Sequence, residues 1–206
     1  MKRKLLLATT NQGKVKEYRS LLEGVPFEMV SPRELGIDAE VEETGQTFEE
    51  NARMKASAMA ERSGLITLAD DSGLEVDALN GEPGVRSARY AGEGATDADR
   101  YNYLLSRMEN LPWPERTARF RCVIAIAVPG GEVMTCEGEC PGIIMLEPKG
   151  DNGFGYDPVF YLPDMDRTMA EISREEKNRI SHRAQAAAKA KKLLQNLPSE
   201  TLGSTA

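Results

Sequence analysis

The sequence predicts an α/β protein, because short buried strands alternate along it with amphipathic helical segments. Residues 5–8 are continuously apolar, as in a strand that is buried on both faces. A polar turn follows, and then Val15, Tyr18, Leu21 and Leu22 recur at helical spacing. This alternation is typical of a sheet covered by helices.

The next elements continue the pattern. Residues 27–30 predict a second strand. Thr47 and Glu50 form a capping-box pattern that opens a helix, and Gly64 suits its end. Residues 65–69 predict an apolar strand that ends at Asp70-Asp71-Ser72-Gly73. Thr96 is expected to cap a helix that reaches about Met108.

The second half predicts a hairpin and two helical starts. Residues 119–128 and 132–136 surround Pro-Gly-Gly, which is typical of a hairpin, and residues 159–162 predict a short strand. Capping-box patterns occur at Thr168/Glu171 and Ser173/Glu176, and the Ala/Lys-rich segment to Leu197 favours a helix. We expect one α/β domain over residues 1–197, with two lobes, and a disordered tail over residues 198–206.

Composition limits the classes of function. The chain has 206 residues and a net charge of −7, which argues against a general nucleic-acid binder. No apolar run approaches the roughly 20 residues that span a membrane, and the N-terminus has too short an apolar stretch for a signal peptide. We therefore expect a cytoplasmic protein with no membrane or nucleic-acid partner. The three cysteines form no CxxC pair, so neither a disulfide framework nor a zinc site is expected.

The first candidate site is the segment ATTNQGK, residues 8–14, at a strand-to-helix turn. Amides at a helix N-terminus favour phosphate. Lys14 would add a full charge there, and Thr9, Thr10 and Asn11 would add neutral donors. The segment lacks the pattern of a Walker phosphate loop. Alternatively, Asn11 caps the helix and Lys14 is solvated.

Carboxylates supply the second candidate site. Two aspartates, Asp70 and Asp71, follow an apolar strand, and strand ends in α/β folds open toward bound ligands. Desolvated carboxylates need compensation, and a cation supplies it. Because successive strand residues point to opposite faces, we expect only one of the two to meet a metal directly. Glu42 and Glu43 lie before a turn, where solvated acids are common.

A glycine-rich loop with aromatic residues is the third candidate. The stretch GDNGFGYDPVF, residues 150–160, places Phe154 and Tyr156 among glycines. Ordering such a loop is entropically costly, which favours a role in binding a ligand. The aromatic rings could stack on a flat base.

The fourth candidate, EEKNRISHR at residues 175–183, holds the only histidine. In one unbroken helix Lys177 and His182 would lie about 140° apart and could not meet one ligand. We therefore predict a helix break at residues 179–181, with Ser181 capping a new helix whose first turn holds His182 and Arg183.

Together these segments resemble the inosine triphosphate pyrophosphatase family, whose members remove non-standard purine nucleotides. The resemblance rests on five segments in the family's order, which cover most of residues 5–190. Asp151-Asn152 departs from the smaller residues that many members have before the glycine loop. The five segments are ATTNQGK, EETGQTFEENARMKA, ADDSGLEVDALNGEPGVRSARYAG, GFGYDPVF and EEKNRISHRAQA.

The resemblance implies hydrolysis of inosine, deoxyinosine and xanthosine triphosphates to the monophosphate and pyrophosphate. It also implies Mg²⁺, a homodimer, and an elongated mixed sheet with two lobes around a central cleft. Glu43 and Asp71 would hold the metal, and Asp71 would also position or deprotonate the attacking water. The residues implied to bind the nucleotide are Thr9, Thr10, Asn11, Gln12, Gly13, Lys14, Ser72, Phe154, Gly155, Tyr156, Asp157, Lys177, His182 and Arg183.

Three alternatives stay open. One is a related pyrophosphatase for modified pyrimidine or methylated nucleotides. Another is a non-catalytic nucleotide sensor, against which the paired acids argue. The third is a nucleic-acid binder that uses the basic C-terminal helix, which the acidic total opposes.

Overall fold

The computed structural model describes residues 3–37 and 41–198. Its strands form one mixed seven-stranded sheet in the order β2-β1-β3-β4-β5-β6-β7. The predicted α/β class is confirmed. The strands are β1 (Arg3–Leu7), β2 (Phe27–Val30), β3 (Ile66–Val76), β4 (Thr117–Ala127), β5 (Val133–Ile144), β6 (Phe160–Leu162) and β7 (Arg167–Thr168).

Six helices accompany the strands in the described part of the chain. Predicted caps fix three of them: Thr47, Thr96 and Ser173 each close a capping box with the residue three positions on. The helices are α1 (Gln12–Leu21), α2 (Pro32–Leu35), α3 (Phe48–Ser63), α4 (Asp97–Arg107), α5 (Arg174–Ile180) and α6 (His182–Gln195).

The chain divides into two compact units, and β3, β4 and β5 each contribute residues to both. Unit 1 comprises residues 1–71, 123–137 and 185–206, and unit 2 comprises residues 72–122 and 138–184. The tail expected at residues 198–206 lies outside the described residues, apart from Pro198. No described helix combines the length and apolar character that crossing a membrane requires.

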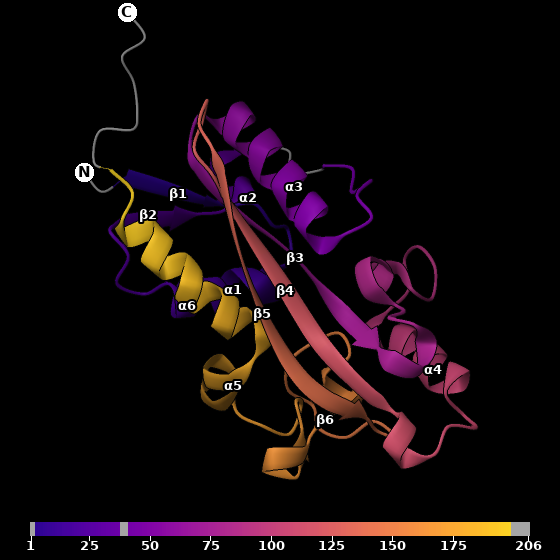
Figure 1. Ribbon diagram of the computed structural model, residues 1–206. Helices are drawn as coiled ribbons and strands as arrows, with labels where there is room; N and C mark the ends of the chain where they lie inside the picture. Colours follow the sequence, from indigo (N-terminus) through magenta and orange to yellow (C-terminus); the bar gives the residue numbers. More distant parts are fainter. Residues whose placement is uncertain (1–2, 38–40, 199–206) are drawn as a thin grey trace, which may run out of the picture. The chain divides into compact units, whose positions relative to one another are not determined.

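Unit 1 is built on parallel strands. β1 pairs with β2 from Arg3↔Phe27 to Leu6↔Val30. It pairs with β3 from Leu5↔Ile66 to Leu7↔Leu68. Leu5, Leu6 and Leu7 are fully buried, as their continuous apolar run predicts. Figure 1 shows α3 on one side of these strands, with α1 and α6 on the other. A central strand covered on both sides needs apolar residues on both faces, which explains the run.

Unit 2 has its own core. It gathers Leu74 and Val76 of β3, Leu104 and Met108 at the end of α4, and Phe160 of β6. The rings of Phe120 and Phe160 lie 4.3 Å apart between centroids. These contacts give unit 2 a hydrophobic centre of its own.

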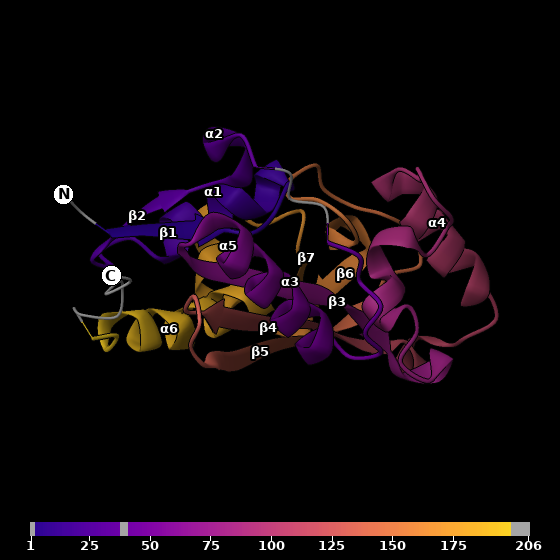
Figure 2. The same cartoon turned by 90° about the horizontal axis from the view of Figure 1, so that it is seen from above.

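Three boundaries differ from the prediction. β3 does not end at residues 70–73 but continues to Val76, because Leu74 and Val76 bury in the unit 2 core. β5 runs to Ile144 and includes Pro141 and two glycines, residue types that indicate the end of a strand in the sequence. A Cβ on Gly142 would lie 2.5 Å from the Phe160 ring, so glycine is required where that ring packs on the strand. β4 and β5 run side by side in Figures 1 and 2.

The third correction concerns Thr168/Glu171, which opens no helix. Thr168 belongs to β7, and its hydroxyl donates to the carbonyl of Lys149 at 2.8 Å. Glu171 still accepts from the Thr168 amide at 2.7 Å. The pattern therefore forms half of its expected contacts in a turn, and the helix begins only after Ser173.

Candidate functional site

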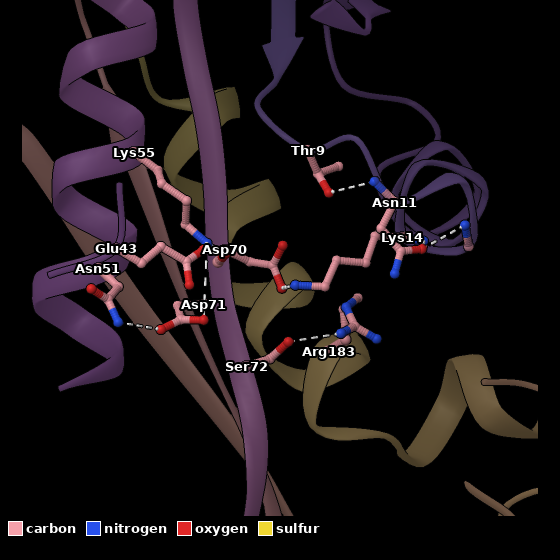
Figure 3. Close-up of polar contacts among 11 residues, drawn as sticks. Thr9, Asn11, Lys14, Glu43, Asn51, Lys55, Asp70, Asp71, Ser72 and Arg183 are labelled. Atoms are coloured by element: carbon pink, nitrogen blue, oxygen red, sulfur yellow. Dashed lines mark hydrogen bonds and ion pairs between the residues drawn. The ribbon is translucent and has the colours of Figure 1, made fainter. Parts of the chain in front are cut away.

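In unit 1, functional side chains gather around the middle of β3. Parallel pairing with β1 ends at Leu68, so Asp70 and Asp71 lie just beyond the carboxyl end of β1 although β3 itself continues. Consecutive strand residues point to opposite sides. Figure 3 shows Asp70 directed toward Lys14 and Asp71 toward Asn51.

Asp70 forms a buried ion pair with Lys14. Lys14 Nζ lies 2.8 Å from Asp70 Oδ2, and the aspartate side chain is 1% exposed. Lys14 is therefore not simply solvated; an opposite charge holds it at the first turn of α1. The pair fixes the Lys14 ammonium beside the turn that follows β1.

Asp71 of β3 belongs to a second charged group, which includes Asn51 and Lys55 of α3. Asn51 Nδ2 donates to Asp71 Oδ2 at 2.9 Å, while Asn51 Oδ1 accepts from the Gly45 amide at 2.8 Å. Lys55 Nζ donates to Glu43 Oε1 at 2.9 Å and to the Asp70 carbonyl at 2.6 Å, and it lies 3.9 Å from Asp71 Oδ1. One ammonium thus lies between the two carboxylates that the family resemblance implies for metal binding.

Burial and charge oppose each other at these groups. Burial raises the pKa of Asp71 above its ordinary value and outweighs the lowering by Lys55 and by the Asn51 hydrogen bond. Burial alone would lower the pKa of Lys55, but Asp70, Asp71 and Glu43 hold it above its usual value. Lys55 therefore stays charged at neutral pH.

The Asn11 side chain caps α1. Asn11 Oδ1 accepts from the amides of Gly13 and Lys14 at 2.8 and 3.2 Å, and Thr9 Oγ1 accepts from the Asn11 amide at 3.2 Å. The helix-cap alternative for Asn11 is therefore confirmed. Since Asn11 engages the Gly13 and Lys14 amides, phosphate would instead be met by side chains of this turn, Lys14 first among them.

The carboxylates fit a divalent cation that also contacts a substrate. Among residues 3–37 and 41–198 no group of three or more Asp, Glu, His or Cys side chains could enclose a metal. Glu43 and Asp71 would supply two acidic ligands. Mg²⁺ accepts one or two carboxylates and completes its octahedral shell with phosphate oxygens and water. A shared ammonium already marks where positive charge is stabilised between these two groups.

In unit 2 the glycine-rich loop surrounds a buried ion pair. Asp157 is 2% exposed; its Oδ2 accepts from the Phe154 amide at 2.9 Å and from Lys177 Nζ. Lys177 Nζ lies 4.7 Å from the centroid of the Phe154 ring, and the Arg183 guanidinium carbon lies 5.5 Å from it. The half-buried Phe154 ring therefore carries two cations at cation–π distance.

Tyr156 has a structural role, unlike Phe154. It belongs to the unit 2 core, and its hydroxyl donates to the Ser87 carbonyl at 2.9 Å. Burial raises the pKa of this phenol. A buried ring with a satisfied hydroxyl cannot stack on a ligand, so of the two aromatic residues only Phe154 keeps the expected stacking role.

The predicted break before His182 is confirmed. α5 ends at Ile180, and Ser181 is extended before α6 begins at His182. The Ser181 hydroxyl accepts from the Ala184 amide at 3.1 Å. His182 stacks on Phe120 with 4.8 Å between ring centroids, and Arg183 donates to the Ser72 hydroxyl at 2.9 Å. The break thus gives Lys177 and Arg183 a shared contact, the Phe154 ring.

We expect Gly153→Ala to destabilise unit 2 more than Gly155→Ala. Both glycines have positive φ, so alanine costs each about 1 kcal/mol of backbone strain. Only at Gly153 would the new Cβ clash, 2.0 Å from Asp157 Oδ2; at Gly155 nothing lies within 4 Å. Urea unfolding should show a further loss of about 1–3 kcal/mol for Gly153→Ala, and equal losses would contradict the assigned role of Asp157 in the loop.

The sequence interpretation gave no role to Asn51 and Lys55. The two lie four positions apart on α3, on one face of the helix, where the facing residues are otherwise apolar. Asn51 is fully buried. Two polar residues four positions apart among alanines could have indicated in the sequence that Asn51 and Lys55 have a role in the site.

Asp70 and Asp71 of the central strand β3 each lie beside a lysine from a neighbouring helix. Such an arrangement suits the binding of a polyanion together with its cation, as in hydrolases of phosphoric anhydrides.

The Ham1 family pattern matches residues 5–193. A dITP/XTP pyrophosphatase of Desulforamulus reducens is 55% identical over 194 residues, 94% of this chain and 96% of that protein. The Bacillus subtilis dITP/XTP pyrophosphatase is 50% identical over 190 residues, 92% of this chain and 96% of that protein.

Solved structures agree with these matches. A HAM1 protein from Coxiella burnetii superposes with a TM-score of 0.87 at 43% identity, over 95% of this chain and all of that one. The chain belongs to the Ham1 family.

Proposed function

We propose that this protein hydrolyses the non-standard purine nucleoside triphosphates dITP, ITP and XTP to the monophosphate and pyrophosphate. The observation that carries the proposal is the pair Glu43 and Asp71 bridged by Lys55, next to the Lys14–Asp70 pair on the same strand. Phosphoryl transfer depends mainly on positioning and charge stabilisation, so cations and carboxylates supply what it needs.

Glu43 and Asp71 would hold a divalent cation, Mg²⁺ by its preference for oxygen ligands. When bound, that cation neutralises charge on the phosphate oxygens. Lys14 and Lys55 contribute further positive charge around the phosphates. Thr9, Thr10, Asn11, Gln12 and Gly13 line the turn that we propose receives the triphosphate.

Asp71 is the proposed general base. A water oxygen forms a bond to the α-phosphorus, the bond from that phosphorus to the bridging oxygen of the β-phosphate breaks, and pyrophosphate leaves. The water proton passes to Asp71. Asn51 holds this carboxylate by its Oδ2, which fixes the orientation of the other oxygen.

We propose that unit 2 supplies the residues that recognise the base. Phe154 offers a flat face with the cations of Lys177 and Arg183 near it, and Asp157 holds Lys177. His182 stacks on Phe120 and precedes Arg183 in the first turn of α6. Gly155 shapes the loop, and Ser72 holds Arg183. The substrate cleft, the homodimer and the cytoplasmic location stay predictions.

Base preference would follow from hydrogen-bond matching. Hypoxanthine and xanthine present a 6-oxo acceptor, whereas adenine presents a 6-amino donor. Donors from His182 and Arg183 suit the oxo group, and each unmatched buried group costs about 1–3 kcal/mol. We expect His182→Ala and Arg183→Ala each to reduce the preference for ITP over ATP by roughly tenfold or more. An unchanged ratio of kcat/KM values in both variants would contradict this assignment.

A substrate panel tests the function. ITP, dITP and XTP are compared with GTP, ATP, dUTP and methylated nucleotides, with pyrophosphate detected in the presence of Mg²⁺ or EDTA. The proposal expects rapid pyrophosphate release from the first three, and only with the metal. Preference for the pyrimidine or methylated substrates would favour the related pyrophosphatase, and binding without release would favour a sensor.

A further inference from the structure

The glycine-rich loop is tied down at its start by neighbouring segments. The Asn152 amide donates to the Ala170 carbonyl at 3.1 Å, and Asn152 Nδ2 donates to the Ile172 carbonyl at 3.2 Å. A Cβ on Gly150 would lie 2.4 Å from the backbone of Ala170. These contacts fix where the loop leaves the core, but they lie before Phe154.

A second tie comes from a residue far away in the sequence. Asp97 Oδ2 accepts a hydrogen bond from the Gly155 amide at 2.7 Å across 58 positions of chain. Its other oxygen, Oδ1, lies 2.5 Å from Arg100 Nη1, and Arg100 Nη2 donates to the Ala95 carbonyl at 2.6 Å. Both oxygens of Asp97 are thus held, which directs Oδ2 at the loop.

The two carboxylates Asp97 and Asp157 enclose Phe154 along the backbone. Asp157 Oδ2 accepts from the amide of Phe154 itself at 2.9 Å, and Asp97 Oδ2 accepts from the next amide. Hydrogen bonds to a charged acceptor are stronger than neutral ones. With the amides on both sides of its Cα fixed, the direction in which the Phe154 ring leaves the backbone is determined.

Helix capping does not explain Asp97. An acidic residue in the first turn of a helix interacts favourably with the helix dipole and so stabilises the helix. In α4 the capping box of Thr96 and Asp99 already satisfies the start of the helix: Thr96 Oγ1 accepts from the Asp99 amide at 3.1 Å, and Asp99 Oδ2 accepts from the Thr96 amide at 2.8 Å. Asp97 Oδ2 instead reaches outside the helix.

We propose that Asp97 is a positioning residue that sets the orientation of Phe154 and thereby the affinity and base preference of the enzyme. It touches neither base nor phosphate and acts through the Gly155 amide. The inference rests on the proposed function, since Phe154 matters in this way only if its ring meets the base.

Three variants of the full chain test the inference: Asp97→Ala, Asp97→Asn and Asp99→Ala. With Mg²⁺ present, kcat and KM are measured for ITP and ATP by pyrophosphate release, and the free energy of unfolding is measured in urea. Asp97→Ala should raise the KM for ITP about tenfold and lower the preference for ITP over ATP by a similar factor, with kcat within about threefold of wild type.

Asp97→Asn keeps an oxygen acceptor for the Gly155 amide and should restore KM to within about threefold of wild type. Asp99→Ala removes the capping box and lowers stability, but KM and base preference should stay at wild-type values. If Asp97→Ala does not fold, Asp97→Ser replaces it, because a serine hydroxyl suits a helix start but is too short to reach the loop amide.

Two results would overturn the inference. One is a wild-type KM and base preference in the variant that lacks the acceptor; the other is an equal rise of KM in Asp99→Ala, which would mean that helix stability alone matters. Failure of the proposed function is distinguishable from both, because wild-type protein would then release no pyrophosphate from ITP.

Discussion

Asp71→Asn should lower kcat for ITP by about 10³-fold, within the range expected when a general base is removed. The substitution keeps the size of the side chain, and an asparagine can still pair with Asn51 by turning its own amide. The buried position tolerates a neutral group well, since burial already raises the pKa of the carboxyl. Melting temperature should therefore change little.

Glu75→Gln is the matched control. Glu75 lies four residues further along β3 and pairs with Arg119 at 2.8 Å and with Arg121 at 3.3 Å. The same chemical change there should leave kcat within about twofold of wild type, because Glu75 pairs with Arg119 and Arg121 and has no part in the charged group of Glu43, Lys55 and Asp71. Near-normal turnover in Asp71→Asn would remove Asp71 from the mechanism.

Lys55→Met should destabilise the metal-free protein by about 3 kcal/mol. Removing one partner of a buried charge pair leaves the remaining charges uncompensated, and here Glu43 and Asp71 both lose their shared ammonium. Asp71 is the more severely affected of the two, because its side chain is 9% exposed whereas that of Glu43 is 31% exposed. The free energy of unfolding in urea with EDTA measures the loss.

Mg²⁺ should return part of that stability. A cation that binds only the folded state stabilises it by about 2.7 kcal/mol at a hundred times its Kd. Because Lys55 competes with the cation for the same carboxylates, the gain should be larger in Lys55→Met than in wild type. Arg53→Met on the same helix, whose exposed pair with Glu49 faces solvent, should cost less than about 0.5 kcal/mol and show no extra gain. Equal Mg²⁺ effects in all three proteins would contradict the shared site.

Local signals in the sequence were sufficient for most helices and for the break before His182. Thr47, Thr96 and Ser173 each cap through contacts only three residues away, so pattern and structure agree. The serine before His182 acts in the same local way, with its hydroxyl on the Ala184 amide. These elements depend on neighbours in the chain, and neighbours are what a sequence displays.

The misplaced boundaries depend on distant partners. β3 continues past Asp71 because Leu74 and Val76 enter a core built from residues 28 to 98 positions further on. β5 requires glycine at position 142 because the Phe160 ring packs over the strand there. Neither partner is visible in the local pattern, where glycine and proline indicate a turn.

The candidate site divides in the same way. Asp70, Asp71 and Lys14 could be named from their residue types and positions in the chain, whereas Glu43 was named only through the family resemblance. The bridging part of Lys55 could not, since it requires α3 to place its ammonium over β3. Asp97 was hidden for a similar reason, as its acceptor role joins α4 to a loop 58 residues away.

Hydrolysis of ITP in ¹⁸O-labelled water tests the central claim most directly. Wild-type protein with Mg²⁺ completes single turnovers, the products are separated, and their ¹⁸O content is measured by mass spectrometry. Attack on the α-phosphorus predicts one ¹⁸O in inosine monophosphate and none in pyrophosphate. Label in the pyrophosphate, or the appearance of inosine diphosphate with orthophosphate, would contradict the account.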